Sequence, residues 1–236
     1  MPLRISYFVP PVPLVAAKAS GLLDDLTIEE TRTPGSAAQL AGLLAGELDV
    51  VVTALDNLFE WTRAGADLRV IGEVEHTTPL AVYAAPEFSD LQALEGATFA
   101  VDALDNGFAL VARHLLHEAG VSVQWVEAGG VAERFEQLRN GDAAAALLGP
   151  PFDARARDAG FRELIRVQDV FPSFPGQGLV VRADLAGSAE VSTLVAALNA
   201  SGLLPVQTGG LDLLAEIRAD LGLLPPQSDL HALVLI

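Results

Sequence analysis

An internal repeat with an offset of 95 residues is the sequence feature that most restricts the fold of this 236-residue chain. The segment 35–56 reads GSAAQLAGLLAGELDVVVTALD, and the segment 130–151 reads GVAERFEQLRNGDAAAALLGPP. Each copy contains a glycine, an amphipathic helix, a glycine that stops the helix, an apolar run and a loop. The coinciding residues are Gly35 with Gly130, Ala37 with Ala132, Leu43 with Leu138, and Gly46 with Gly141. The repeat therefore predicts two halves with a common supersecondary structure.

The repeat also decides how the segment 143–148, AAAALL, is interpreted. An alanine run favours a helix by propensity, but the Gly-Pro-Pro that follows it cannot continue a helix. In the first copy the same place holds DVVVTA, a β-branched run typical of a buried parallel strand. We therefore predict that residues 143–148 pair in a parallel sheet.

Predicted strands and helices alternate along the chain, which indicates an α/β fold with mainly parallel sheets flanked by helices. Strands are expected at 4–9, 26–30, 50–53, 69–73, 80–84, 98–101, 122–126, 143–148 and 164–167, and helices at 13–20, 36–45, 56–64, 107–119, 131–139 and 152–159. The segments 83–88 and 171–178 look like two crossings between lobes. We expect lobe I to comprise residues 1–84 and 175–236, lobe II to comprise residues 85–174, and a ligand cleft to lie between them.

The charge balance and the absence of cysteine exclude several classes of function. The chain has 14 Lys+Arg against 31 Asp+Glu, a net charge of −17, which disfavours nucleic-acid and membrane-surface partners. Without cysteine there are no disulfides, thiolate nucleophiles or cysteine-based metal sites. No apolar run has the length of a membrane span, and no secretory signal is visible. We expect a cytoplasmic protein if Met1 is the native start, and an extracytoplasmic one if a leader was removed.

Ligands of open parallel sheets bind beyond the carboxyl ends of the strands, where the strand order reverses. The repeat supplies matched loops there: 8–12 with 102–107, 35–36 with 129–130, and 53–57 with 149–153. Each loop leads into a helix, whose amino terminus can hold ligand oxygens. The residues expected to bind ligand are Phe8, Pro10, Ser36, Thr53, Asp56, Asp102, Asn106, Gly130 and Phe152.

Ordinary structural roles compete with these assignments. Ser36 can be a helix N-cap, and capping is favoured over ligand contact for Asp56 and Asp153, which open helices. Asp102 is harder to explain in this way, because Asn106-Gly107 can cap the following helix instead. Aromatic residues near the loops are more often core, and Phe152 is the preferred exception because two prolines restrict its position.

The histidines give no clear metal or catalytic pattern, and no metal or cofactor is expected. His114 and His117 lie three apart on one predicted helix, where they are interpreted as part of a solvated helix end. His76, which follows Glu73 and Glu75, is the histidine that we would test for chemistry.

Five segments together resemble a known family. They are PLVAAKASGLLDD at 13–25, LAGLLAGELDVVVTALD at 40–56, LEGATFAVDALDNGFALVARHLLHEAGV at 94–121, LRNGDAAAALLGPPFDARARDAGFREL at 138–164 and FPGQGLVVRADL at 174–185. The chain resembles the type II periplasmic-binding-protein fold, in the ABC-transporter solute-binding group of nitrate, sulfonate, taurine and thiamine-pyrimidine binders. The resemblance implies two lobes, a two-crossing hinge, a ligand closed between the lobes and a permease partner. The chain departs from the group in two respects. It lacks the lipobox cysteine, and Leu14 and Val15 occupy the part of the first helix where the group commonly has an aromatic residue.

Two functions remain open. The first is a solute-binding protein for a small neutral or amine-bearing planar molecule, because the loops are acidic and poor in basic residues. The second is a cytoplasmic small-molecule enzyme on the same fold, either similar to the menaquinone-pathway enzymes or a proton-transfer enzyme using Asp102, Asp105 or His76. The sulfinate desulfinase and thiamine-pyrimidine synthase of this fold are excluded, because their chemistry depends on cysteine.

Overall fold

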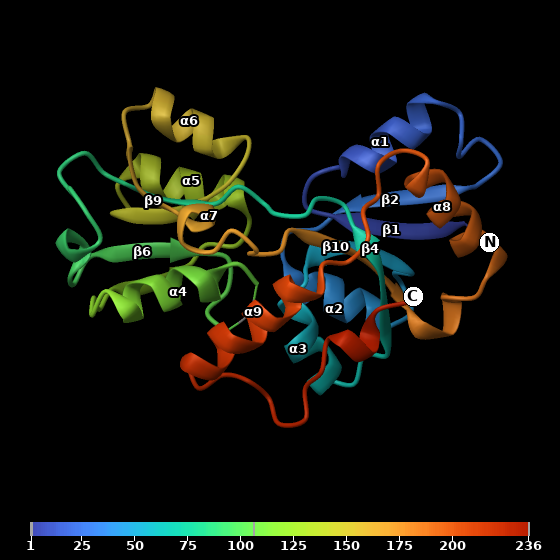
Figure 1. The fold of residues 1–236 in the computed structure, drawn as a ribbon. Coiled ribbons are helices and arrows are strands. Elements are labelled where there is room, and N and C mark those ends of the chain that lie inside the picture. The colour runs from blue at the N-terminus through green and yellow to red at the C-terminus, as the bar shows by residue number, and fades with distance from the viewer. Residues whose placement is uncertain (1, 106, 236) are drawn as a thin grey trace. The chain divides into compact units, whose positions relative to one another are not determined.

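Two five-stranded mixed sheets organise the computed structural model, which describes residues 2–105 and 107–235 (Figure 1). The first sheet has the order β2 (Ile28–Arg32), β1 (Leu3–Tyr7), β3 (Val50–Ala54), β10 (Gln177–Arg182) and β4 (Leu68–Glu73). The second has the order β7 (Gln124–Glu127), β6 (Thr98–Val101), β8 (Ala145–Leu148), β5 (Ala81–Ala84) and β9 (Arg162–Arg166). In each sheet the first three strands are parallel and the fourth is antiparallel to both of its neighbours. The predicted α/β fold with mainly parallel strands is confirmed.

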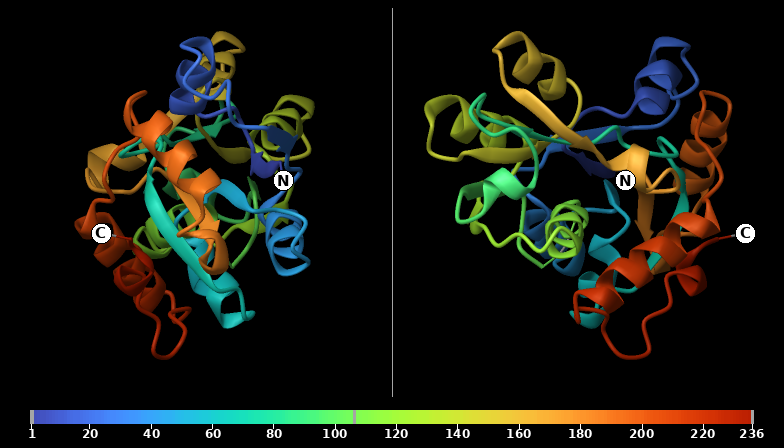
Figure 2. Two further views of the ribbon diagram at one scale, coloured as in Figure 1. Left: turned by 90° about the vertical axis from the view of Figure 1, so that its right-hand side faces the viewer. Right: turned by 60° about the vertical axis from the view of Figure 1, so that its left-hand side comes forward.

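Helices cover both faces of each sheet (Figures 1 and 2). On the first sheet, α1 (Val12–Ala19) and α8 (Ala189–Asn199) lie on one face, and α2 (Ser36–Leu44) and α3 (Asn57–Arg63) on the other. On the second, α5 (Val131–Asn140) and α6 (Phe152–Asp158) lie on one face and α4 (Ala109–Glu118) on the other. The remaining helices are α7 (Val167–Val170), α9 (Thr208–Asp220) and the 3₁₀ turns η1 (Gln92–Leu94), η2 (Ala183–Leu185) and η3 (His231–Leu233). None of the helices among the described residues is long and apolar enough to span a membrane.

The chain divides into two compact units at boundaries that differ from the expected ones. Unit 1 comprises Met1–His76, Pro175–Leu211 and Pro225–Ile236, and unit 2 comprises Thr77–Phe174 and Asp212–Leu224. Strand β5, expected in the first lobe, pairs with β8 and β9 of the second sheet, so the first boundary precedes it. Residues 212–224 belong to unit 2, although the segment directly before them, residues 175–211 with strand β10, belongs to unit 1.

The alanine-rich segment of the second repeat is a strand, as the repeat predicted. Ala145 and Ala146 of β8 pair in parallel with Phe99 and Ala100 of β6, and the four residues of β8 are buried. Helix α5 and β5 pack against this strand, so its small side chains lie in the core of unit 2. Burial on both faces explains why the segment lacks the alternating pattern of a surface strand.

Each unit has its own hydrophobic core. In unit 1, Ile5 and Val52 of the sheet pack with Leu14 of α1 and Leu194 of α8, and all four are buried. In unit 2, the corresponding cluster joins β5, β6 and β8 with Phe135 and Leu138 of α5 and Ala156 of α6. These cores hold the sheets and helix starts from which the candidate site is built.

Candidate functional site

The strand order reverses at one place in each sheet. In unit 1 the chain passes from β1 to the edge strand β2 and returns to β3 on the other side of β1. In unit 2 it passes from β6 to β7 and returns to β8 in the same way. Ligands of open α/β sheets bind beyond the carboxyl ends of such strand pairs. Each unit therefore has its own candidate position, at the ends of β1 and β3 in unit 1 and at the ends of β6 and β8 in unit 2.

Gln39, which the sequence analysis did not select, lies at the reversal point of unit 1. Its side chain is fully buried, and its Nε2 donates to the carbonyl oxygens of Ser6 at 3.3 Å and Val52 at 3.2 Å. These two carbonyls fix the orientation of the amide, because a flipped amide would bring three oxygens together. The Gln39 Oε1 is buried and accepts no hydrogen bond from the described residues. Unit 1 thus presents one uncommitted hydrogen-bond acceptor beneath α2.

Arg134 of α5 occupies the same position in unit 2, 95 residues after Gln39. Its Nε donates to the carbonyl oxygen of Leu147, which is the repeat equivalent of Val52, and its Nη1 donates to Gly129, both at 2.9 Å. The side chain is 5% exposed, and burial lowers the pKa of the guanidinium. The repeat could have revealed this pair, since its offset aligns two polar residues on helices that each cover a sheet.

Asp102 follows β6, and its Oδ1 lies 3.7 Å from Nη1 of Arg134. Backbone N–H groups of Asp102, Ala103 and Phe108 hydrogen bond to its carboxyl group, yet Oδ1 is buried without a hydrogen bond among the described residues. Burial raises the pKa of this carboxyl group, and the charge of Arg134 opposes the shift. Because Phe108 precedes α4, the aspartate also holds the start of that helix; Asn106, the other predicted residue here, lies outside the described residues.

The rest of the loop after β6 is held by charged side chains. Arg113 of α4 donates to the carbonyl oxygen of Leu104 and lies 2.9 Å from the Asp105 carboxylate, which is 73% exposed. Glu127 accepts a hydrogen bond from the Leu104 N–H at 2.8 Å. In the structure the Asp105 carboxylate is therefore an exposed partner of an arginine.

In unit 1 the predicted residues Phe8 and Thr53 come shortly after Ser6 and Val52, whose carbonyl oxygens accept hydrogen bonds from Gln39. Thr53 and Asn57 are buried, and the Asn57 Nδ2 lies 2.8 Å from the Thr53 Oγ1. Asp56 is 2% exposed. Phe8 and Pro10 are half-buried between β1 and α1, and Ser36 is half-buried at the start of α2.

Of the three predicted caps, Ser36 and Asp153 are wrong, and Asp56 is the N-cap residue. Ser36 is the first residue of α2 and Gly35 is its N-cap, without a side-chain hydrogen bond. Asp56 is the N-cap of α3 by position, but its carboxylate makes no capping hydrogen bond. Asp153 lies inside the first turn of α6 and pairs with Arg157 at 3.2 Å. Capping depends on backbone geometry, which residue type alone does not determine.

Gly130 and Phe152 frame the site part of unit 2. Gly130 is buried and is the N-cap of α5. Phe152 begins α6 and is half-buried, with its ring 5.6 Å from that of Phe135 and 4.6 Å from the Arg155 guanidinium carbon. Phe152 therefore also belongs to the periphery of the core of unit 2.

The histidines lie in three different environments. His76 hydrogen bonds through Nδ1 to Oε2 of the fully buried Glu73 at 2.8 Å, in unit 1. His114 is buried, its ring 5.5 Å from that of Phe171, so its interpretation as part of a solvated helix end is wrong. His117 is exposed. No cluster of three potential metal ligands occurs among the described residues.

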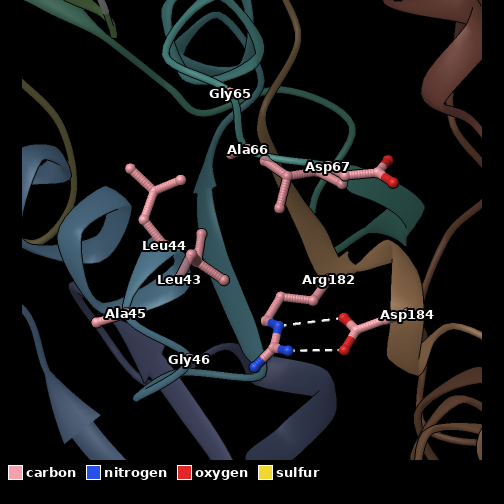
Figure 3. A pocket seen from close by; sticks show the side chains of 10 residues that line it. Leu43, Leu44, Ala45, Gly46, Gly65, Ala66, Asp67, Arg182 and Asp184 are labelled. Carbon is pink, nitrogen blue, oxygen red and sulfur yellow. Dashed lines mark hydrogen bonds and ion pairs between the residues drawn. The ribbon is translucent and has the colours of Figure 1, made fainter.

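A pocket of about 440 Å³ in unit 1 lies at the opposite edge of the sheet (Figure 3). It is formed by the end of α2, the segment before β4, and the residues after β10. Arg182 crosses it and pairs with both carboxylate oxygens of Asp184, at 2.7 and 3.1 Å. The residues predicted to bind ligand do not line this pocket, which lies at the amino-terminal ends of the parallel strands.

Residues 13–202 match the model of the NMT1/THI5-like family, which is most of the chain. The chain belongs to this family. Solved structures similar to this NMT1/THI5-like protein include three ligand-bound proteins. The first is the zinc-bound ligand-binding component of an ABC-type import system from Staphylococcus aureus (15% identity, covering 95% of this chain and 93% of that chain, TM-score 0.76). The second is the alkanesulfonate-binding protein of Xanthomonas axonopodis pv. citri bound to MOPS (17% identity, covering 99% of this chain and 97% of that chain, TM-score 0.75). The third is PhnD1 of Prochlorococcus marinus with methylphosphonate (13% identity, covering 94% of this chain and 98% of that chain, TM-score 0.71).

At these identities the comparison establishes the fold, and it confirms the resemblance to type II periplasmic binding proteins. A search of curated proteins finds no significant match to this NMT1/THI5-like chain.

Proposed function

We propose that this NMT1/THI5-like protein is a solute-binding protein that binds a small organic ligand for ABC-type uptake. The observation that carries the proposal is the matched pair Gln39 and Arg134, each buried at the strand-order reversal of its sheet. Buried polar groups placed alike at both reversal points are expected of a binding site, because polar burial without function is costly. The structural relatives support the proposal, since they include a component of an ABC-type import system and an alkanesulfonate-binding protein.

We propose ligand contacts within each unit, at the strand ends described above. Unit 1 contributes Phe8, Pro10, Ser36, Thr53 and Asp56 together with Gln39. Unit 2 contributes Asp102, Gly130 and Phe152 together with Arg134; Asn106, which the sequence also predicts, lies outside the described residues.

The alternative of a proton-transfer enzyme has weaker support. Asp105 is exposed and paired with Arg113. His76 hydrogen bonds to the buried Glu73, which also accepts a hydrogen bond from the Gln207 N–H, so this cluster anchors backbone. Asp102 is the acid whose environment would suit either function.

Native mass spectrometry of the protein purified without denaturation tests the proposal, followed by small-angle scattering with the identified ligand. We expect a retained small molecule and a smaller radius of gyration on binding. At a ligand concentration of about 100 times Kd, the free energy of unfolding should rise by about 2.7 kcal/mol. Turnover of the ligand, lost in Asp102→Asn while binding is retained, would instead identify an enzyme.

A further inference from the structure

Two buried polar atoms on helix α3 have no hydrogen bond among the described residues. They are Oδ1 of Asn57, a residue that is 2% exposed, and Nε1 of Trp61, a residue that is 0% exposed, and both belong to unit 1. A buried donor or acceptor without a partner costs free energy, so such atoms are normally bonded to protein or to internal water. These two atoms therefore mark a place for a bound partner inside unit 1.

The spacing of the two side chains fits one bridging molecule. Residues four apart on an α-helix are neighbours on one face, and Asn57 and Trp61 have this spacing on α3. The indole nitrogen can only donate a hydrogen bond, and the amide oxygen can only accept one. A molecule that joins them must accept from one and donate to the other inside a site enclosed by protein. Water does both and is small enough for such a site.

The amide of Asn57 is oriented by a second contact. Its Nδ2 donates to Oγ1 of Thr53 at 2.8 Å, so Oδ1 lies on the side of the amide away from this hydroxyl. In the reverse orientation that side would carry N–H groups, and a water bound to Trp61 would then meet donors from both residues. The observed orientation is the one that a bridging water favours.

The same contact determines what the Thr53 hydroxyl can offer. A hydroxyl group has one hydrogen and two lone pairs, and the Thr53 oxygen accepts from Asn57. Among the described residues no group accepts its hydrogen. Thr53 is the fourth residue of β3, at the strand end where unit 1 has its candidate position. The hydroxyl therefore presents a hydrogen-bond donor there.

We propose that an internal water bridges Trp61 Nε1 and Asn57 Oδ1, and that this chain of contacts positions the Thr53 hydroxyl. The water accepts from the indole and donates to the amide oxygen, and the amide in turn donates to the hydroxyl. Trp61 and Asn57 are positioning residues. A ligand of unit 1 then needs an acceptor for the Thr53 hydrogen, and only this consequence rests on the proposed function.

NMR cross-peaks to water test the bridge directly. The chain has two tryptophans, Trp61 and Trp125, so two indole N–H signals are expected. We expect the Trp61 signal to show cross-peaks at the water frequency with opposite signs in NOE and ROE spectra, which identify a long-lived contact rather than proton exchange. The peaks should persist in Thr53→Val, because no hydroxyl hydrogen is then available to relay them. Their absence from the wild type, or their loss in Thr53→Val, would overturn the water site.

A double-mutant cycle tests whether the water couples the two side chains. Trp61→Phe and Asn57→Leu each leave one buried partner unsatisfied, whereas the double variant removes both. We expect each single variant to lower the folding equilibrium constant at least fivefold, and the double variant to lower it at least fivefold less than the product of the two. Multiplicative effects would overturn the bridge. Trp125→Phe combined with Asn57→Leu is the matched control and should show multiplicative effects.

Hydrogen exchange of the Asn57 side-chain amide tests the positioning role, because this amide holds the Thr53 hydroxyl. Trp61→Phe should raise its exchange rate at least tenfold relative to that of the Thr53 backbone N–H, and Trp125→Phe should leave the ratio unchanged. An unchanged ratio in Trp61→Phe would overturn the positioning role, since general loosening of the fold affects both groups alike.

Native mass spectrometry of the variants tests the consequence for the ligand. The fraction of protein that carries the retained molecule should fall at least tenfold in Thr53→Val and stay as in the wild type in Trp125→Phe. Equal retention by Thr53→Val would overturn the donor role of Thr53 and leave solute binding intact. A wild type that retains no molecule would contradict the proposed function and this consequence, while the water cross-peaks and the cycle still decide the bridge.

Discussion

Arg218 of α9 donates from Nη2 to the backbone carbonyl oxygen of Asp105, at 3.0 Å and across 113 residues of the chain. Its Nη1 donates to the carbonyl oxygen of Leu223 at 3.1 Å, and the side chain is fully buried. Both acceptors belong to unit 2, so this arginine connects the C-terminal helix to the loop that carries Asp102. The link gives residues 212–224 a role in shaping the proposed ligand loop.

Arg218→Met should lower the free energy of unfolding by about 2–3 kcal/mol, because it leaves buried carbonyls without their donor. Urea denaturation measures the loss, and hydrogen exchange should show faster exchange in residues 103–108. The control Arg63→Met removes an exposed pair with Glu60 and should change stability by less than about 0.5 kcal/mol. Similar losses in both variants would contradict the anchoring role of Arg218.

Tyr83 predicts a specific loss of stability at high pH. Burial raises the pKa of its phenol to about 12, with a contribution from Glu163, which accepts the hydroxyl hydrogen bond at 2.6 Å. An unfolded tyrosine has a pKa of about 10, so its stabilising contribution is complete below pH 10 and is lost as the pH rises towards 12. The loss over this interval is about 2–3 kcal/mol.

Tyr83→Phe should remove this part of the pH dependence. Urea denaturation of both proteins between pH 9 and 11.5 measures it, and the difference between the two curves isolates Tyr83 from Tyr7, whose pKa is also raised. Parallel curves over this range would show that the phenol ionises with its ordinary pKa.

The backbone around Gly176 leaves no room for a β-carbon at this position. A Cβ at this position would lie 2.3 Å from the carbonyl oxygen of Glu75, a backbone atom that cannot move alone. Gly176→Ala should therefore lower the free energy of unfolding by about 1–3 kcal/mol through overpacking. Gly187→Ala is the matched control, because a Cβ there meets nothing within 4 Å. Thermal melts that coincide for the two variants would refute the clash.

Asp49 predicts sensitivity to acid. Although its burial acts in the opposite direction, hydrogen bonds from the Arg4 side chain and backbone hold the pKa of Asp49 below its usual value. Its stabilising contribution is present above the unfolded pKa of about 3.9 and is lost as the pH falls through the lower folded value. Asp49→Asn should cost about 1–3 kcal/mol at pH 7, and its stability should converge with that of the wild type below pH 4. A constant gap between the two proteins from pH 7 to pH 3 would contradict this linkage.

Local patterns in the sequence were sufficient for much of the fold. The repeat predicted β8 correctly against the helical propensity of its alanines, because a strand buried on both faces needs small or apolar residues rather than alternation. The loops of the candidate site were also placed after the right strands, since each strand end was marked by a change in composition.

The pairing of strands that are distant in the chain could not be predicted from local sequence patterns. The assignment of β5 to the second sheet depends on its contacts with β8 and β9, more than 60 residues later in the chain. The predicted caps at Ser36 and Asp153 were wrong for a similar reason, because a cap requires a particular backbone direction as well as a suitable side chain.

The sequence by itself determined the α/β class, the repeated unit and the family, because these follow from periodicity, turn residues and the order of motifs along the chain. Only the tertiary structure decided the chemistry of the candidate site. Gln39 and Arg134 are polar residues on amphipathic helices, and no local pattern tells an outward side chain from one that bonds to strand carbonyls. That distinction arises when a helix packs on a sheet and its polar side chains must find partners in the buried strands.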